Sequence, residues 1–239
     1  PVSVGVAAVS AVAVPGAVRG LAHLLARFGS MPFREVIAPA VRLAEEGFAV
    51  DRYLAERIAT TLDYIRRYPE TGRIFLDADG KPLQAGAHLR LPDLAGSLRR
   101  LQEAGPDDLY EGDLAETILA EIRRGGGFMT ARDLAGFRPV EREPVTGRFL
   151  GHEVATMPPP SSGAFVLAGL SRLKGEDGPD RYLRLGTAMR DMFALRATTL
   201  GDPAFAAVDL APLGIDNASL RLAEPPQTTS LSTMDAAGN

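Results

Sequence analysis

The sequence predicts an α+β fold that is mostly helical, with a few short strands. Apolar residues recur at helical spacing through the first two-thirds of the chain, and the pattern becomes alternating near residue 145. A length of 239 residues is enough for one or two domains with a buried core. Hydrophobic residues make up 46% and charged residues 23%, as is usual for a soluble globular protein.

Helices are expected wherever the apolar residues are spaced three or four apart. The first such stripe covers residues 33–44, where Gly47 supplies a stop and Pro39 should kink or divide the helix. Thr130 and Asp133 have the spacing of a capping box at a later helix start. Further stripes predict helices at residues 53–65, at residues 94–101 after Pro92, and at residues 114–122 before Gly125-Gly126-Gly127.

The pattern changes to that of short strands at residues 145–157. Two strands are expected on either side of Gly151-His152, and Pro158-Pro159-Pro160 should end the second, because proline cannot donate to a strand ladder. Ser161-Ser162-Gly163 is then expected to cap a helix at residues 164–173. A longer helix at about residues 181–200 should end at Gly201-Asp202-Pro203.

The last twelve residues predict a strand followed by a turn. Residues 228–234 alternate Thr or Ser with apolar residues, and residues 235–239 suit a hairpin turn. A lone strand that ends at a turn is not a stable sheet element. We therefore expect the natural protein to continue beyond residue 239.

Composition excludes several classes of function. The chain has no cysteine, which rules out disulfides, thiolate catalysis and cysteine-based zinc sites within it. His23, His88 and His152 are far apart and lack metal-ligand spacing. A net charge of −4 argues against nucleic acid as a partner, and no apolar run reaches the length needed to span a membrane.

Seven short motifs follow one another along nearly the whole chain. The most specific of them includes Pro158-Pro159-Pro160-Ser161-Ser162-Gly163. In chain order the others are Val14-Pro15-Gly16 through Gly20, Phe28-Gly29 with Ala38-Pro39-Ala40 through Phe48, Gly105-Pro106 with Leu109-Tyr110-Glu111-Gly112, Leu134 to Pro144, Gly201-Asp202-Pro203, and Gln227-Thr228-Thr229 with Ser232, Asp235, Gly238 and Asn239. With these motifs in this order, the chain resembles the γ-glutamyltransferase family of N-terminal-nucleophile hydrolases over nearly its whole length.

The resemblance implies a precursor that cuts itself between Gln227 and Thr228. Residues 1–227 then belong to the C-terminal part of a large subunit, and residues 228–239 begin a small subunit. It further implies a four-layer αββα sandwich for the complete protein. The implied partners are a small γ-glutamyl substrate such as glutathione and the rest of the small subunit, with no cofactor. A periplasmic or extracellular location is favoured, and a cytoplasmic one is left open.

The resemblance assigns the nucleophile role to Thr228. A threonine hydroxyl needs a base to take its proton, and at a new N-terminus the α-amine of the same residue, with a pKa of about 7.7–8.0, can be that base. Judged without the family, residues 228–234 are also compatible with an ordinary edge strand. Ser161-Ser162 is interpreted as a helix cap, and the three glycines at 125–127 as a helix terminator.

Several positions depart from the family pattern. Ser230 replaces the histidine that follows the Thr pair, and Leu185, Thr187 and Leu195 replace a histidine, a glutamate and an aspartate of the long helix, whereas Arg196 is kept. The substrate-gripping arginine, the second threonine and the oxyanion donors of the family lie outside this chain. Without an oxyanion hole much of the electrostatic stabilisation is missing, so we expect the isolated chain to be inactive.

Two other functions remain open at this point. One is a related acylase that acts on a cephalosporin-type or oxamate-type amide. The other, supported by the altered long helix, is a non-catalytic relative that serves as a binding or assembly module.

Overall fold

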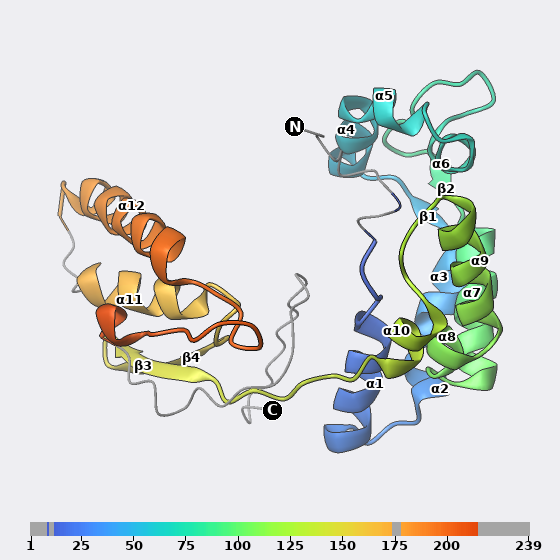
Figure 1. Cartoon of the computed structure of the whole chain (residues 1–239). Helices are drawn as coiled ribbons and strands as arrows, with labels where there is room; N and C mark the ends of the chain where they lie inside the picture. Colours follow the sequence, from blue (N-terminus) through green and yellow to red (C-terminus); the bar gives the residue numbers. More distant parts are fainter. Residues whose placement is uncertain (1–8, 10–11, 174–177, 215–239) are drawn as a thin grey trace. The chain divides into compact units, whose positions relative to one another are not determined.

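A computed structural model describes residues 9, 12–173 and 178–214, which form two compact units (Figure 1). The N-terminal unit spans Pro1–Pro139 and the C-terminal unit spans Val140–Asn239. The N-terminal unit contains α1 (Ala17–Phe28), α2 (Phe33–Val36), α3 (Ala38–Glu46), β1 (Phe48–Ala49), α4 (Arg52–Thr60), α5 (Leu62–Ile65), α6 (Pro69–Phe75), β2 (His88–Leu89), α7 (Pro92–Ala104), α8 (Asp108–Glu111), α9 (Asp113–Arg124) and α10 (Ala131–Gly136). The C-terminal unit contains β3 (Val145–Phe149), β4 (His152–Thr156), α11 (Gly163–Leu173), α12 (Arg181–Thr199) and the 3-10 helix η2 (Ala211–Leu213).

Proline and glycine divide and end the first predicted helix as expected. The stripe at residues 33–44 forms α2 and α3, which are separated at Ile37, with Pro39 in the first turn of α3. Gly47 ends α3 with φ at 84°, a left-handed conformation that glycine adopts at little cost.

The second predicted stripe is interrupted at Thr61, which separates α4 from α5. The Thr61 hydroxyl donates to the carbonyl of Arg57 at 2.7 Å, a side-chain bond that competes with regular helix geometry. Asp51 caps α4 by accepting from the N–H of Leu54 at 2.7 Å. Buried residues of both helices form one apolar cluster with residues next to or in β1 and β2; its buried members are Val50, Ile58, Ile65 and Leu89. Tyr53, the first residue of the predicted stripe, is 72% exposed and does not belong to this face.

Helices α7, α9 and α10 confirm the remaining predictions for the N-terminal unit. The N–H groups of Gly126 and Gly127 donate to the carbonyls of Arg123 and Ile122, so these glycines do terminate α9. Thr130 and Asp133 form the reciprocal capping box of α10. Helices α1, α6 and α8 and the short strands β1 and β2 were not predicted.

The C-terminal unit consists of the β3–β4 hairpin, α11 and α12. The strands pair antiparallel with Val145 opposite Thr156, and the turn at Leu150 and Gly151 has both φ values positive, at 51° and 84°. Figure 1 shows α11 between the hairpin and α12. The core between these elements is made by Val145, Ala164, Phe165, Leu167, Ala168, Met192, Leu210 and Leu213.

The described part of the chain is an α+β structure in which helices predominate, as the sequence predicts. Its sheets are the two-stranded pairs β1–β2 and β3–β4. None of the described helices has both the length and the apolar character that crossing a membrane requires. The predicted strand at 228–234, the turn at 235–239 and the subunit boundary at 227/228 lie outside the described residues.

Candidate functional site

The predicted nucleophile and cleavage site are not among the described residues. Gln227, Thr228 and Ser230 all fall outside them, and their roles stay predictions. What the structure does describe is how the other motifs of the resemblance contact one another. These contacts separate motif residues that build the scaffold from those that line a surface.

Arg19, in the first motif, is buried and binds residues of two later motifs. Its guanidinium donates to the Asp107 carboxylate at 2.8 Å and to the Glu111 carboxylate at 3.1 Å. It also donates to the carbonyls of Phe137 at 2.7 Å and Ala135 at 3.4 Å. A buried charge requires such compensation. This motif arginine therefore has a structural role, which the sequence analysis did not assign to it.

Tyr110 completes the same contact region. Its hydroxyl donates to the Pro15 carbonyl at 2.5 Å and accepts from the Arg19 N–H at 3.0 Å. A tyrosine hydroxyl is protonated and able to donate at neutral pH, and burial raises the pKa of this one above its usual value. The ring stacks on Phe137 with centroids 6.1 Å apart, and a Cβ on Gly16 would lie 2.7 Å from the Phe137 ring. Close packing against the Phe137 ring therefore favours glycine at position 16 of the first motif.

Asp108 lies at the start of α8 and is buried. Its two carboxylate oxygens accept from Arg100 Nε and Nη2 at 3.1 and 2.8 Å, and one also accepts from the Leu114 N–H at 3.2 Å. The hydrogen bonds from Arg100, aided by those from the backbone, hold the pKa of this carboxyl below its usual range. A Cβ on Gly112 would clash with the Asp108 side chain. These residues fix the turn between α8 and α9.

Two backbone carbonyls of the Glu45-Glu46-Gly47 motif bind side chains in β2 and directly after it. The carbonyl of Glu45 accepts from Arg90 Nε at 2.7 Å, and the carbonyl of Glu46 lies 2.7 Å from His88 Nε2. A Cβ on Gly47 would approach Arg90 Cγ to 2.6 Å. His88 thus has a local structural partner, in keeping with its lack of metal-ligand spacing.

The proline-serine motif forms the turn from β4 into α11. The Ser162 carbonyl accepts the first helical hydrogen bonds, from Phe165 at 3.0 Å and Val166 at 3.2 Å, which is the N-cap position. The Ser162 hydroxyl accepts from Arg196 Nε at 2.9 Å. The retained arginine of α12 therefore binds the most specific motif of the chain.

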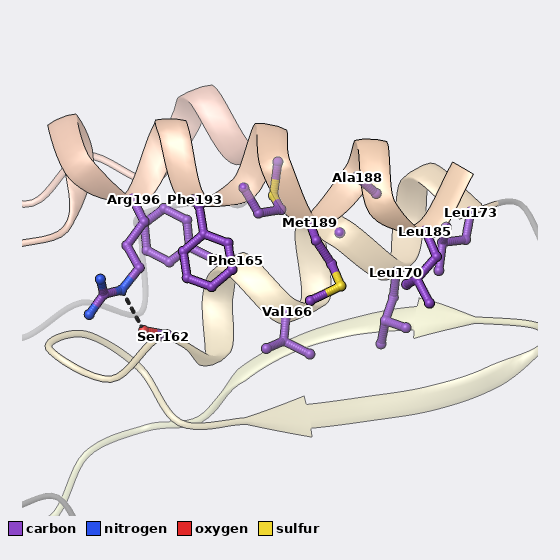
Figure 2. A pocket seen from close by; sticks show the side chains of 12 residues that line it. Ser162, Phe165, Val166, Leu170, Leu173, Leu185, Ala188, Met189, Phe193 and Arg196 are labelled. Atoms are coloured by element: carbon purple, nitrogen blue, oxygen red, sulfur yellow. Dashed lines mark hydrogen bonds between the residues drawn. The ribbon is translucent and has the colours of Figure 1, made fainter. Parts of the chain in front are cut away.

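The departures from the family pattern lie on different sides of α12. Leu185 lines a groove between α11 and α12, Thr187 is exposed, and Leu195 packs against the core of the C-terminal unit. Figure 2 shows this groove, with Ser162 and Arg196 at one end. Its volume is about 490 Å³, and it is lined by Ser162, Phe165, Val166, Gly169, Leu170, Leu173, Leu185, Ala188, Met189, Met192, Phe193 and Arg196.

The described residues offer no candidate metal centre. No group of three or more His, Asp or Glu side chains within them is arranged to hold a metal ion. The ionisable groups described above are engaged in hydrogen bonds within the scaffold. The geometry therefore gives the described motif residues roles in building the fold.

Comparison with known proteins identifies the fold and the family. Residues 3–224 match the family described as gamma-glutamyltranspeptidase. The chain is 28% identical to the gamma-glutamyltranspeptidase of Helicobacter pylori, with a TM-score of 0.78 over 83% of this chain and 59% of that one. It is 30% identical to a cephalosporin acylase from Bacillus halodurans, with a TM-score of 0.76 over 83% of this chain and 39% of that one. These likenesses confirm the expected fold class.

Two curated relatives are considerably longer than this chain. The Acylase ACY 1 proenzyme of Pseudomonas sp. (strain SE83) is 40% identical over 216 residues, which cover 87% of this chain and 38% of the relative. The glutathione hydrolase proenzyme of Escherichia coli (strain K12) is 36% identical over 202 residues, which cover 81% of this chain and 35% of the relative. With the family match extending over residues 3–224, the chain belongs to the γ-glutamyltranspeptidase family.

Proposed function

We propose that this chain is a segment of a self-processing amide hydrolase or acyltransferase that cuts itself between Gln227 and Thr228 and uses Thr228 as its nucleophile. The observation that carries the proposal is the family match over residues 3–224, which ends four residues before Thr228. The names of the two curated relatives describe them as proenzymes, which supports processing of a precursor.

Processing and catalysis use the same hydroxyl. In the precursor, Thr228 Oγ1 attacks the Gln227 carbonyl carbon, and the acyl group moves from the Thr228 nitrogen to its oxygen. Water then hydrolyses this ester, which releases the Gln227 carboxylate and regenerates the hydroxyl beside a free α-amine. That amine has a pKa of about 7.7–8.0 and can accept the hydroxyl proton in the next reaction.

The proposed substrate is a γ-glutamyl amide such as glutathione. Thr228 Oγ1 attacks the γ-amide carbonyl, the C–N bond breaks, and the leaving amine takes the proton. The γ-glutamyl ester is then transferred to water or to a second amine. The naming of the Escherichia coli relative as a glutathione hydrolase supports this substrate class. The rest of the small subunit is the proposed partner that supplies the oxyanion donors, so the 239-residue chain alone is expected to be inactive.

A second candidate is an acylase that acts on a different side chain. Two Acylase ACY 1 proenzymes from Pseudomonas, at 40% and 39% identity, favour it, as does the structural likeness to a cephalosporin acylase. Activity of the full-length protein on γ-glutamyl anilide compared with glutaryl anilide separates the two candidates. A preference for the glutaryl compound would replace the first proposal by the second.

Self-cleavage is tested by expressing the full-length protein and separating it on a denaturing gel. Two subunits are expected, with the second starting at Thr228 by N-terminal sequencing. Thr228→Ala removes the hydroxyl and should leave one band, whereas Thr228→Ser retains a hydroxyl and should still be cut. Thr233→Ala, the same change five residues on, is the matched control and should be processed normally. One uncut band from the parental sequence would favour a non-catalytic binding or assembly module.

A further inference from the structure

We propose that Arg221 binds the Asp202 carboxylate and so tethers the segment that leads to the bond between Gln227 and Thr228. In this role Asp202 is a positioning residue for self-cleavage. The tether itself does not depend on the reactivity of Thr228. Its effect on the rate of self-cleavage rests on the proposed function.

Asp202 lies directly after α12, in a turn that its own backbone and side chain hold. The Asp202 carbonyl accepts from the N–H groups of Phe205 and Ala206, both at 2.9 Å. Its side-chain Oδ1 atom accepts from the Ala204 N–H at 3.0 Å. The same turn therefore also sets the position of the second carboxylate oxygen, Oδ2.

Asp202 Oδ2 lacks a donor. The atom is buried, and it accepts no hydrogen bond from any residue in the part of the chain that the structure describes. Buried polar atoms of folded proteins nearly always have a partner, because a buried oxygen without one loses its hydration and gains nothing in return. We therefore expect the donor to come from residues outside the described ranges. A guanidinium suits a carboxylate best, since its fork of N–H groups makes charge-assisted hydrogen bonds.

The sequence that follows contains one candidate cation. Residues 215–239 include Arg221 and no other arginine, lysine or histidine. Asp216 and Glu224 are the acidic residues nearest to Arg221 in this segment, so they are the competing partners for its guanidinium. Asp202 differs from them in that its Oδ2 atom is already buried and needs a donor.

The chain is long enough for this contact. Leu200 and Val208, on either side of Asp202, pack against the apolar core that contains Leu213. The segment after Gly214 therefore starts from the same body that holds Asp202. Arg221 is seven positions beyond Gly214, and seven extended residues span at most about 25 Å. This reach is close to twice the radius of gyration of about 13 Å that is expected for a compact unit of about 100 residues.

A tether at Arg221 restricts the position of the bond that is cut. Gln227 lies thirteen positions after Gly214 but only six after Arg221. Pro225 and Pro226 fall within those six and favour extended backbone, at about 3.1 Å per residue. The effective concentration of one chain end at the other falls roughly as the −3/2 power of the length between them. Shortening the free chain from thirteen to six residues therefore raises it about threefold.

Trypsin tests the contact directly, because it cuts after arginine and the residue after Arg221 is Leu222. Full-length protein with Thr228→Ala is digested briefly, so that no self-cleavage occurs during the measurement. Mass spectrometry gives the rate of cutting between residues 221 and 222. Asp202→Asn keeps Oδ1 as the acceptor for Ala204 and removes the charge, so it should raise this rate on the order of tenfold, the effect of one charge-assisted hydrogen bond.

Asp209→Asn is the matched control. Asp209 is exposed, and its Oδ1 atom accepts from the Ala211 N–H at 2.9 Å, in the same kind of turn. Cutting after Arg221 should be unchanged in this variant. An unchanged rate in Asp202→Asn would overturn the proposal. An equal rise in cutting after Arg172, within α11, would overturn it too, because the whole unit would then have opened.

The competing partners within the segment give a different result. Asp216→Asn and Glu224→Gln should leave the rate of cutting after Arg221 as it is in the parental protein. A tenfold rise in either variant, without one in Asp202→Asn, would assign the guanidinium to that residue and overturn the proposal.

Variants of Arg221 test the effect on self-cleavage and do not alter the turn at Asp202. With Thr228 intact, Arg221→Met should slow the appearance of the second subunit about threefold, and Arg221→Lys, which keeps the charge, should restore most of the rate. Combining Arg221→Met with Asp202→Asn should slow it no further, because both changes break one contact. Equal rates for Arg221→Met and the parental protein, or additive effects, would overturn the positioning role. A parental protein that is never cut would contradict the proposed function instead, and trypsin would still decide the tether.

Discussion

The guanidinium carbon of Arg19 lies 4.0 Å from the centroid of the Tyr110 ring, 91 positions along the chain. The same arginine donates to carboxylates beside that tyrosine and to carbonyls after α10. Three motifs of the family pattern thus meet at one buried side chain. In this region the three motifs occur together in the sequence because their residues contact one another in the folded protein.

Arg19→Met should destabilise the N-terminal unit by about 2–4 kcal/mol, because it removes the cation over the Tyr110 ring and the hydrogen bonds of a buried guanidinium to Asp107 and Glu111. Chemical unfolding followed by far-ultraviolet circular dichroism measures the change, since the chain contains no tryptophan. Arg27→Met is the matched control: Arg27 also lies over an aromatic ring, that of Phe28, but both are exposed, and a change within about 0.5 kcal/mol is expected. Equal effects of the two changes would argue against the structural role of Arg19.

Asp108→Asn should reduce stability at neutral pH and much less in acid. The folded-state pKa of Asp108 is lowered by Arg100, so its carboxylate stabilises the fold above the unfolded pKa of about 3.9. This contribution is lost as the pH falls through the lower, folded-state pKa. Unfolding free energies of both proteins between pH 7 and pH 2 should therefore converge at the acid end.

Asp113→Asn provides the comparison for that titration. Asp113 binds the same Arg100 at 2.7 Å, but its side chain is 73% exposed, and an exposed ion pair contributes little. A small effect, with little dependence on pH, is expected. A difference between the parental protein and Asp108→Asn that stays constant down to pH 2 would contradict the role given to the Asp108 carboxylate.

Gly163→Ala should destabilise the C-terminal unit by roughly 1–3 kcal/mol through overpacking. A Cβ at this position would clash with the Thr156 hydroxyl and the Met157 carbonyl, and would lie 2.9 Å from the Met157 nitrogen. Gly186→Ala in the middle of α12 meets nothing within 4 Å and should instead stabilise by about 0.4–1 kcal/mol. Thermal unfolding of the two variants should shift in opposite directions, and a shift of the same sign would refute the steric argument.

The full-length protein should lose activity in mild acid. If the α-amine of Thr228 is the base, kcat/KM should fall about tenfold per pH unit below the amine pKa of about 7.7–8.0. Thr228→Ser keeps both the amine and a hydroxyl, so its profile should have the same shape at a lower level. A rate that is constant from pH 5 to pH 8 would point to a different base.

The larger elements were predictable because each carries a local signal. Pro39 and Gly47 placed the division and the end of the first helix, and Thr130 with Asp133 placed the start of α10. The β3–β4 hairpin followed from its alternating pattern around Gly151. These signals act within a few residues, so no knowledge of tertiary contacts was needed.

What could not be predicted depends on contacts between distant residues. The break at Thr61 arises where a side chain takes a backbone carbonyl from the helix, and α8 is fixed by the buried Asp108–Arg100 contact. The sequence showed Arg19 only as a residue of the first motif and did not indicate its contacts. For the candidate site, the resemblance predicts the role of Thr228. The hydrogen bond between Arg196 and Ser162, by contrast, could be recognised only from the distance between these two residues in the structure.

The bond from Arg19 to the Phe137 carbonyl closes a separation of 118 residues. During synthesis at about 5–20 residues per second, α1 leaves the ribosome many seconds before its acceptor has been made. Until then, the Arg19 side chain and the apolar residues around it are exposed to solvent or bound by a chaperone. The N-terminal unit therefore completes its fold only as its last residues emerge, and a nascent chain halted before residue 137 should remain open to proteases.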